Sequence, residues 1–296
     1  MNSKTLLIGN DINNATENYS WKDLITGLLD YAKIEKKVNI ENKPFPLLYE
    51  EIYLKSFQHY STPESRIKKY IASQTRKLNN NILHSEILGL GIENILTTNY
   101  DLLFETASNI DKKKCVNKGL IKESLYSLFR FHQTENHKIW HIHGSETNPK
   151  TITLGYEHYS GYLQQMRNYV TTGTKGIYSK KDFLPLSKRL KDNQIENESW
   201  VDFFFVNDVY IFGLNLDFVE MHLWWLLTYR ARAKMEGKFP IKNKIIYYYP
   251  DKYKEKSKNK LEMFKSLGVE TKSMTIVKDN KIDYYKKIIN NIKNGA

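Results

Sequence analysis

Short apolar runs alternate along the chain with longer segments in which apolar residues recur every three or four positions. The short runs are typical of buried strands, and the longer segments are typical of helices with an apolar face. We expect strands at residues 5–8, 139–143, 151–154, 209–212, 244–249 and 271–277, and a further strand that begins at Ile95. Because helical segments separate most of these strands, the order predicts an α/β fold with a parallel sheet.

The same spacing predicts the helices. We expect them at residues 21–34, 47–57, 63–78, 79–90, 156–170, 183–190, 217–234, 253–267 and 282–292, with one more whose first apolar residue is Leu102. Residues 110–118 have the composition of a loop, and residues 119–131 fit a strand or a helix. We therefore expect one Rossmann-like domain over residues 1–296, its parallel sheet flanked by helices. Residues 35–90 and 145–207 would form helical insertions, and the second would cover a cleft or offer a surface to a partner.

Composition excludes several classes of protein. The hydrophobic fraction is 41%, which suits a globular core, and no apolar run is long enough to span a bilayer. Gly9 and Asp11 interrupt the first apolar run, so we expect no leader peptide and a cytoplasmic protein without membrane contact. The single cysteine, Cys115, excludes an internal disulfide and a four-cysteine zinc site, and we interpret it as a loop thiol.

The formal net charge of +12 is compatible with nucleic acid, an acidic partner or an anionic small molecule. The positive residues are dispersed, apart from local clusters at Lys112–Lys114 and residues 252–260. This distribution favours a solvated surface over a dedicated nucleic-acid groove. Nucleic acid is therefore expected only through a partner or through this basic surface.

Polar residues follow four of the predicted strands at the point where each strand ends. The turns contain Gly9, Asn10, Asp11 and Asn13; Thr98, Asn99 and Asp101; His143 and Gly144; and Gly213 and Asn215. Ligands of an open α/β sheet bind at the carboxyl ends of its strands, so we expect these turns to form a single cleft. The first turn has the layout of a dinucleotide-binding crossover without a full glycine fingerprint, and it is equally compatible with an ordinary loop.

The chemistry of these residues suits attack at a ribose carbon that carries nicotinamide. The amide of Asn99 can hold a ribose hydroxyl or a water, and His143 can accept a proton near neutral pH. The turns at Gly9 and Gly213 offer backbone N–H groups to a pyrophosphate and an adenosine. The alternatives remain open at this point: His143 as a core histidine bonded to a backbone carbonyl, and Asn99 as a turn former.

The sequence gives no clear metal site. His141 and His143 are two residues apart on one strand and would share a face. No matching pair of an acid and a histidine is apparent elsewhere, so we expect no metal.

These motifs resemble a known family. Thr97-Thr98-Asn99-Tyr100-Asp101 resembles the Asn-x-Asp element of sirtuins, and His143-Gly144-Ser145 resembles their catalytic His-Gly. Gly213-Leu214-Asn215-Leu216 looks like their later loop at the adenosine end of NAD, and the turn at Gly9 stands where they have a glycine loop. The chain is similar to the sirtuin-like NADases of bacterial anti-phage defence, which share the Thr-Thr-Asn-Tyr-Asp form and have helical insertions instead of a zinc module.

The resemblance implies Asn99 and His143 as the catalytic pair, with Asp101 at the nicotinamide-ribose end. It implies contacts to NAD from Gly9, Asn10, Asp11, Asn13, Thr98, Asp101, Gly213 and Asn215. Asp11 departs from the family because glycine is usual there, and an acid close to a pyrophosphate repels it. We expect Asp11 either to point away or to serve the ribose.

The resemblance also implies the function: an NAD⁺ hydrolase that releases nicotinamide and ADP-ribose as an NAD-depleting defence effector. Such an activity requires restraint, by a homo-oligomer or by a separate sensor such as a helicase-like ATPase or an Argonaute-like protein. A single cysteine cannot supply the usual zinc module of deacylating sirtuins, which argues against deacylation. Two alternatives remain open, a module that binds NAD or ADP-ribose without turnover and an ADP-ribosyltransferase.

Overall fold

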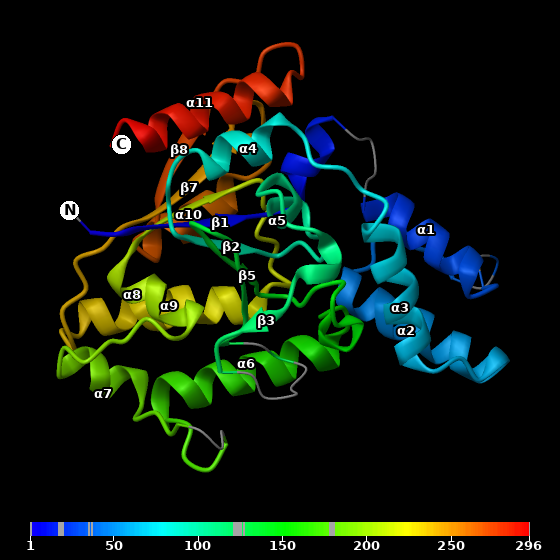
Figure 1. Ribbon diagram of the computed structural model, residues 1–296, viewed down its shortest axis with the longest axis horizontal. Helices are drawn as coiled ribbons and strands as arrows, with labels where there is room; N and C mark the ends of the chain where they lie inside the picture. Colours follow the sequence, from blue (N-terminus) through cyan, green and yellow to red (C-terminus); the bar gives the residue numbers. More distant parts are fainter. Residues whose placement is uncertain are drawn as a thin grey trace.

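A sheet of eight strands, in the order β3-β4-β5-β2-β1-β6-β7-β8, forms the centre of the molecule (Figure 1). The computed structural model describes residues 2–16, 21–34, 36, 38–120, 126, 128–177 and 181–295. The strands are β1 (Lys4–Ile8), β2 (Asn94–Thr97), β3 (Asn117–Lys118), β4 (Phe131–Gln133), β5 (Lys138–His141), β6 (Asp208–Phe212), β7 (Ile245–Pro250) and β8 (Glu270–Met274).

Six of these strands are parallel and follow one another in the sheet as β5-β2-β1-β6-β7-β8. Numbered among themselves along the chain they have the order 3-2-1-4-5-6, which is the Rossmann arrangement. The predicted α/β class is therefore confirmed. The sheet is not wholly parallel, because β3 and β4 extend it beyond β5 as antiparallel strands.

The helices are α1 (Trp21–Tyr31), α2 (Phe45–Tyr60), α3 (Glu64–Thr75), α4 (Ile82–Leu88), α5 (Leu103–Ala107), α6 (Tyr156–Thr171), α7 (Leu186–Lys191), α8 (Trp200–Val206), α9 (Met221–Met235), α10 (Lys258–Ser266) and α11 (Lys281–Lys293). The residues described by the structure also form the short 3₁₀ helices η1 (Asn10–Ala15), η2 (Lys112–Lys114), η3 (Pro149–Thr151) and η4 (Asp251–Tyr253). Within the described part of the chain, none of the helices combines the length and the apolar character needed to cross a membrane.

Helices cover both faces of the sheet because its central strands are apolar on both sides. Leu7 faces a core that also contains residues of α6, α8, α9 and α10. Leu6 and Ile8 face the opposite core, with residues of α4, α5 and α11. Successive side chains of a strand point to opposite faces, so the run of buried residues in β1 supplies both cores.

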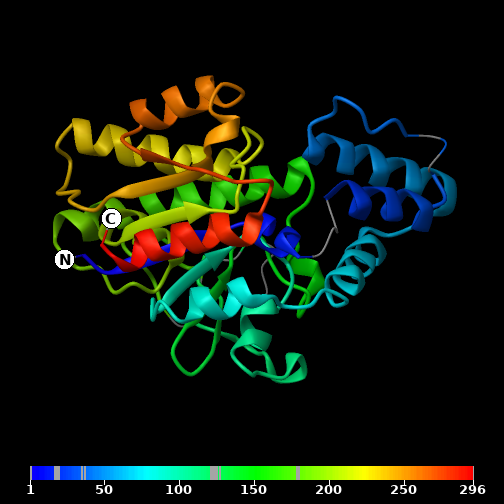
Figure 2. The ribbon, with the colours of Figure 1, turned by 90° about the horizontal axis from the view of Figure 1, so that it is seen from above.

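The helices α1, α2 and α3 form a third core beside the sheet (Figures 1 and 2). Tyr100, which follows β2, and Leu154, which precedes α6, are buried in this core. The three helices are thus tied to the carboxyl ends of the strands. Of the other helices in the predicted insertions, α4 packs on the sheet face with α11, and α6 packs beside α9.

Several sequence-based boundaries were wrong. The strand predicted at residues 151–154 is absent, since η3 ends at Thr151 and the next three residues form no ladder. Ile152 and Leu154 are apolar because they fill the core of α1–α3. The helix predicted to begin at residue 217 begins at Met221, after a turn in which Leu216 has a φ of 47°.

Other differences concern short elements. The helix predicted from residue 253 begins at Lys258, after the separate 3₁₀ helix η4. The segment 110–118, predicted as a loop, contains η2 and the edge strand β3. Residues 119–131, which the sequence left open, enter β4 at Phe131, whereas residues 121–125 and 127 lie outside the described residues.

Candidate functional site

The two central strands end in turns that touch each other. The N–H of Gly9, after β1, donates to the carbonyl of Phe212 at 3.1 Å, and the N–H of Asp11 donates to the carbonyl of Gly213 at 3.0 Å. A Cβ at Gly9 would collide with the Gly213 carbonyl oxygen and with Leu214. The turns interlock where the strand order reverses, between β1 and β6, and this is where open α/β sheets bind ligands.

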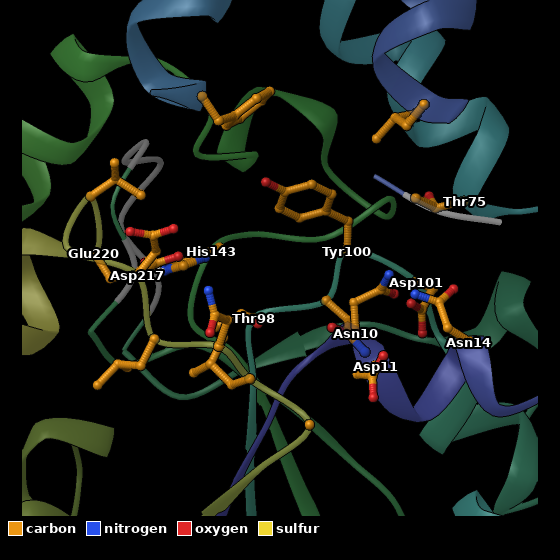
Figure 3. A pocket seen from close by; sticks show the side chains of 18 of the residues that line it. Asn10, Asp11, Asn14, Thr75, Thr98, Tyr100, Asp101, His143, Asp217 and Glu220 are labelled. Carbon is orange, nitrogen blue, oxygen red and sulfur yellow. Dashed lines mark ion pairs between the residues drawn. The ribbon is translucent and has the colours of Figure 1, made fainter. Parts of the chain in front are cut away.

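A cavity of about 400 Å³ opens above these turns, within the usual range for small-molecule sites. It is lined by Asn10, Asp11, Asn14, Leu24, Phe45, Thr75, Leu78, Thr98, Asn99, Tyr100, Asp101, His143, Tyr159, Gly213, Leu214, Asn215, Leu216, Asp217, Val219 and Glu220. The structure thus brings residues from all four predicted strand ends to one cavity. In Figure 3 His143, Asp217 and Glu220 gather at one end, and Asn10, Asn14 and Asp101 at the other.

The backbone of Asn99 is fixed by contacts on both sides, whereas its side-chain carboxamide is unpaired. Its N–H donates to the hydroxyl of Thr97 at 3.1 Å, and its carbonyl lies 2.9 Å from Nδ1 of His141. The side chain is 6% exposed and lines the cavity, yet neither Oδ1 nor Nδ2 has a hydrogen-bond partner among the described residues. Unpaired buried amides are unfavourable, so a ligand that pairs with this amide would stabilise the site.

His143 follows β5 on a turn that only glycine can complete. Gly144 has a φ of 86°, and a Cβ there would collide with the backbone of Thr151. The His143 ring lies edge-on to Tyr159 with centroids 5.7 Å apart. Burial lowers the pKa of His143 to about 3, so the imidazole is neutral at pH 7 and is a weaker base than the sequence predicted.

Two residues that sequence reasoning missed lie against His143. Nε2 of His143 is 3.1 Å from Nε2 of His222 and 3.3 Å from Oε2 of Glu220. Burial, and then the nearby Asp217 carboxylate, raise the pKa of Glu220 to about 8. Burial, and then His143, hold the pKa of His222 well below its usual value. The spacing Glu220-x-His222 at the start of α9 is the sequence signal that could have found them.

Asp101 is fixed by a hydrogen-bonded chain from the first turn. Its Oδ2 accepts from Nδ2 of Asn13 at 2.9 Å, and its Oδ1 accepts from the N–H of Leu103 at 3.2 Å at the start of α5. The Asn13 oxygen lies 3.1 Å from Nε2 of His84, whose Nδ1 accepts from the N–H of Asn81. Asn13 is not among the described residues that line the cavity, so its visible role is to hold Asp101.

A second buried cluster lies behind Asn99. One oxygen of Glu105, Oε1, is 2.8 Å from Nε2 of His141 and 2.6 Å from Nδ1 of His132. Burial would raise the pKa of Glu105, but the two histidines outweigh it and lower that pKa to about 2. The cluster anchors His141, which in turn holds the Asn99 carbonyl.

The remaining predicted residues differ in whether their polar groups are already bonded to other residues of the protein. Asp11 does not carry a free charge, because Lys281 bonds its Oδ1 at 2.7 Å and Tyr285 bonds its Oδ2 at 2.6 Å. Asn215 accepts from Lys260 through Oδ1 at 2.7 Å. Asn10, Thr98 and Gly213 line the cavity, whereas Gly9 is not among the described residues that line it and its N–H donates to Phe212.

Residues of the α1–α3 core form another part of the cavity wall. Leu24 comes from α1, Phe45 from α2 and Thr75 from α3, and Leu78 follows α3. The Thr75 hydroxyl donates to Glu146 at 2.9 Å. The helices beside the sheet therefore supply apolar surface above the polar strand ends, as a cofactor site requires.

Residues 93–199 match the SIR2-like domain. The match covers less than half of the chain, and it contains both Asn99 and His143. A comparison with curated proteins found no match. The SIR2-like match supports the resemblance to sirtuins, and SIR2-like domains bind NAD.

Proposed function

We propose that the chain is an NAD⁺ glycohydrolase that cleaves the bond between nicotinamide and ribose. The observation that carries the proposal is the buried, unpaired amide of Asn99, which lines the same cavity as the neutral imidazole of His143. The SIR2-like match supports the choice of NAD as the ligand.

In the proposed reaction the C1′–N bond of the nicotinamide ribose breaks, and nicotinamide leaves with the bonding pair. The ribose carbon becomes oxocarbenium-like, and a water adds to it. The Asn99 amide holds this water or a ribose hydroxyl, and His143 accepts the proton that the water loses. The products are nicotinamide, ADP-ribose and a proton.

The strand-end turns would hold the rest of the dinucleotide. We assign contacts to Asn10, Thr98, Asp101, Gly213 and Asn215, which line the cavity. Gly9 and Asn13 would act by shaping the turn and by holding Asp101. Asp11 would remain close to the pyrophosphate because Lys281 offsets its charge. The helices α2 and α3, within the proposed insertion at residues 35–90, would cover the dinucleotide together with α1.

The defence role and its regulation extend the proposal. Free NAD cleavage would deplete the cell, so we infer that the activity is restrained. A homo-oligomer or a separate sensor protein would supply the restraint and the trigger. We propose on these grounds, and on the resemblance to sirtuin-like NADases, that the chain is an anti-phage effector.

The test is to incubate the protein with NAD⁺ in its activating context and to follow free nicotinamide. We expect Asn99→Ala and His143→Ala each to lower the rate by at least about 100-fold, the usual scale for a lost proton acceptor or positioning group. Asn290→Ala and His59→Ala are the matched controls, because both residues are exposed on helices away from the cavity. Both controls should release nicotinamide at the parent rate.

Labelled NAD⁺ separates the alternatives. Label in free ADP-ribose supports hydrolysis, and label retained on protein or nucleic acid indicates ADP-ribosyl transfer instead. Tight NAD⁺ binding by calorimetry without product in any activating context would replace the proposal with a binding module. Parent-rate release by either folded site variant would remove that residue from the mechanism.

A further inference from the structure

Three side chains with metal-ligand chemistry converge at one end of the cavity. His143 comes from the turn after β5, whereas Glu220 and His222 come from the start of α9. The two histidines are buried, and the Glu220 side chain is 13% exposed. Among the described residues, Oε2 of Glu220 and Nδ1 of His222 have no hydrogen-bond partner.

The three ligand atoms lie within 4.8 Å of one another, and both distances from His143 are those of a coordination shell. Nε2 of His143 is 3.1 Å from Nε2 of His222 and 3.3 Å from Oε2 of Glu220. Zinc bonds of about 2.0–2.2 Å in a tetrahedron put neighbouring ligand atoms about 3.3 Å apart. Two imidazoles and one carboxylate are also a ligand set that catalytic zinc sites use.

The cluster behind Asn99 provides an internal comparison. It has the same composition, Glu105 with His132 and His141, and its ligand atoms also lie close together. There, however, one carboxylate oxygen lies 2.6 Å and 2.8 Å from the two ring nitrogens. These are hydrogen-bond lengths, too short for the edges of a coordination tetrahedron. Of the two clusters, the cavity cluster fits an ion better.

We propose that His143, Glu220 and His222 bind a divalent transition-metal cation of the zinc class. His143 and Glu220 line the cavity, so a cation bound by the three side chains would lie at the cavity wall. Without the ion, one of the two facing imidazoles donates a hydrogen bond to the other. The ion takes the place of the proton between the two rings, and that proton moves to Nδ1 of the donating imidazole. Glu220 binds as the carboxylate and releases the proton of its acid form to water.

The cation would switch off His143 as a proton acceptor. A neutral imidazole has one nitrogen with a lone pair, and when the ion occupies it the other nitrogen carries hydrogen. His143 is then a donor only. The cation site is independent of the proposed NAD⁺ cleavage, but this loss of a proton acceptor rests on it. If both hold, zinc should inhibit nicotinamide release.

The test measures binding of Zn²⁺ to the metal-free protein in competition with a chromophoric chelator. We expect one Zn²⁺ per chain, with affinity at least about tenfold weaker in Glu220→Gln and in His222→Ala, since even residues around a metal ligand change affinity by that much. His59→Ala removes an exposed histidine of α2 and should bind as the parent does. Glu220→Gln keeps the side-chain shape and serves if His222→Ala fails to fold.

Zinc binding that is absent, or equally tight in parent, Glu220→Gln and His222→Ala, would overturn the site. Nicotinamide release is then measured with and without Zn²⁺ at saturating occupancy. If the protein binds Zn²⁺ through these residues but never cleaves NAD⁺, the proposed site is supported and the proposed function is refuted. If the protein cleaves NAD⁺ but does not bind Zn²⁺, the proposed function is supported and the proposed site is refuted.

Discussion

The carbonyl oxygen of Asn99 lies 2.9 Å from Nδ1 of His141, so a buried histidine of β5 holds the backbone of the cavity residue that follows β2. His141 is anchored in turn by Glu105 at 2.8 Å. The amide of Asn99 can stay unpaired because its backbone is fixed on both sides. The position of Asn99 therefore depends on a carboxylate that does not line the cavity.

Glu105→Gln should destabilise the fold and change its pH dependence. Losing one partner of a buried charged cluster costs about 2–4 kcal/mol in free energy of unfolding at pH 7. The folded-state pKa of Glu105 is lowered to about 2, so the carboxylate contributes stability that is complete above its usual pKa of 4.5. This contribution is lost as the pH falls from about 4.5 towards 2. His141 has a raised pKa, so its contribution is complete below 6.5 and is lost as the pH rises above its folded value.

Urea unfolding of parent and variant between pH 3 and pH 7 measures this effect. The parent should lose stability on acidification more steeply than Glu105→Gln. Glu255→Gln, an exposed position, should follow the parent curve. Parallel profiles for parent and Glu105→Gln would show that the cluster does not hold an ionised carboxylate.

Gly9→Ala should lower the free energy of unfolding, because the added Cβ collides with neighbouring atoms. Gly9 has a φ of −104°, which any residue adopts, but its Cβ would meet the Gly213 carbonyl and Leu214. Overpacking of this kind costs about 1–3 kcal/mol and would separate the turns of β1 and β6. Gly89→Ala is the control, because Gly89 follows α4 with right-handed helical backbone angles and a Cβ there meets nothing closer than 3.3 Å. The expected change in free energy of unfolding is under about 1 kcal/mol. Thermal unfolding of both variants checks this, and equal melting temperatures would contradict the packing argument.

The sequence predicted the strand ends of the cavity because each apolar run stops abruptly at polar residues. Asn99 and His143 could be recognised in this way, since strand, turn and helix are local patterns. The residues that contact His143 from the start of α9 could not be recognised from the sequence. Glu220 and His222 lie in a segment that was interpreted as helix packing, and their approach to His143, 79 positions away from His222, depends on the tertiary fold.

The wrong predictions share a physical origin. Ile152 and Leu154 gave the pattern of a strand, but they are apolar because the α1–α3 core needs them. The strands β3 and β4 are too short to show alternation, and pairing with the edge of β5 creates them. The pairing of Asp11 with Lys281 could not be predicted either, because the two residues are 270 positions apart in the sequence.

Lys281→Met should weaken NAD⁺ binding without touching the ligand site directly. Lys281 pairs with Asp11, which lines the cavity, and its loss leaves a carboxylate near the proposed pyrophosphate. Both side chains are partly exposed, so we expect a loss of affinity of only about two- to tenfold, larger at low salt. Calorimetry at two salt concentrations measures it.

Adding Asp11→Asn to Lys281→Met should restore the affinity, since the uncompensated charge is gone. Lys286→Met is the matched control on the same helix, because Lys286 pairs with Glu86. An affinity loss of equal size in Lys286→Met would mean that general surface charge, and not the Asp11 pair, is responsible.

Phe45→Ala should weaken NAD⁺ binding without slowing the reaction, because the α1–α3 helices would contribute to binding and the strand ends to the chemistry. Phe45 lines the cavity from the first residue of α2, whereas Asn99 and His143 come from the loops after β2 and β5. Truncating one apolar wall residue removes about 1 kcal/mol of ligand contact, so KM for NAD⁺ should rise about three- to tenfold while kcat changes less than about twofold. Phe57→Ala, an exposed residue on the same helix, should leave both constants unchanged. A fall in kcat with an unchanged KM would mean that α2 acts in the reaction itself and not as part of the cavity wall.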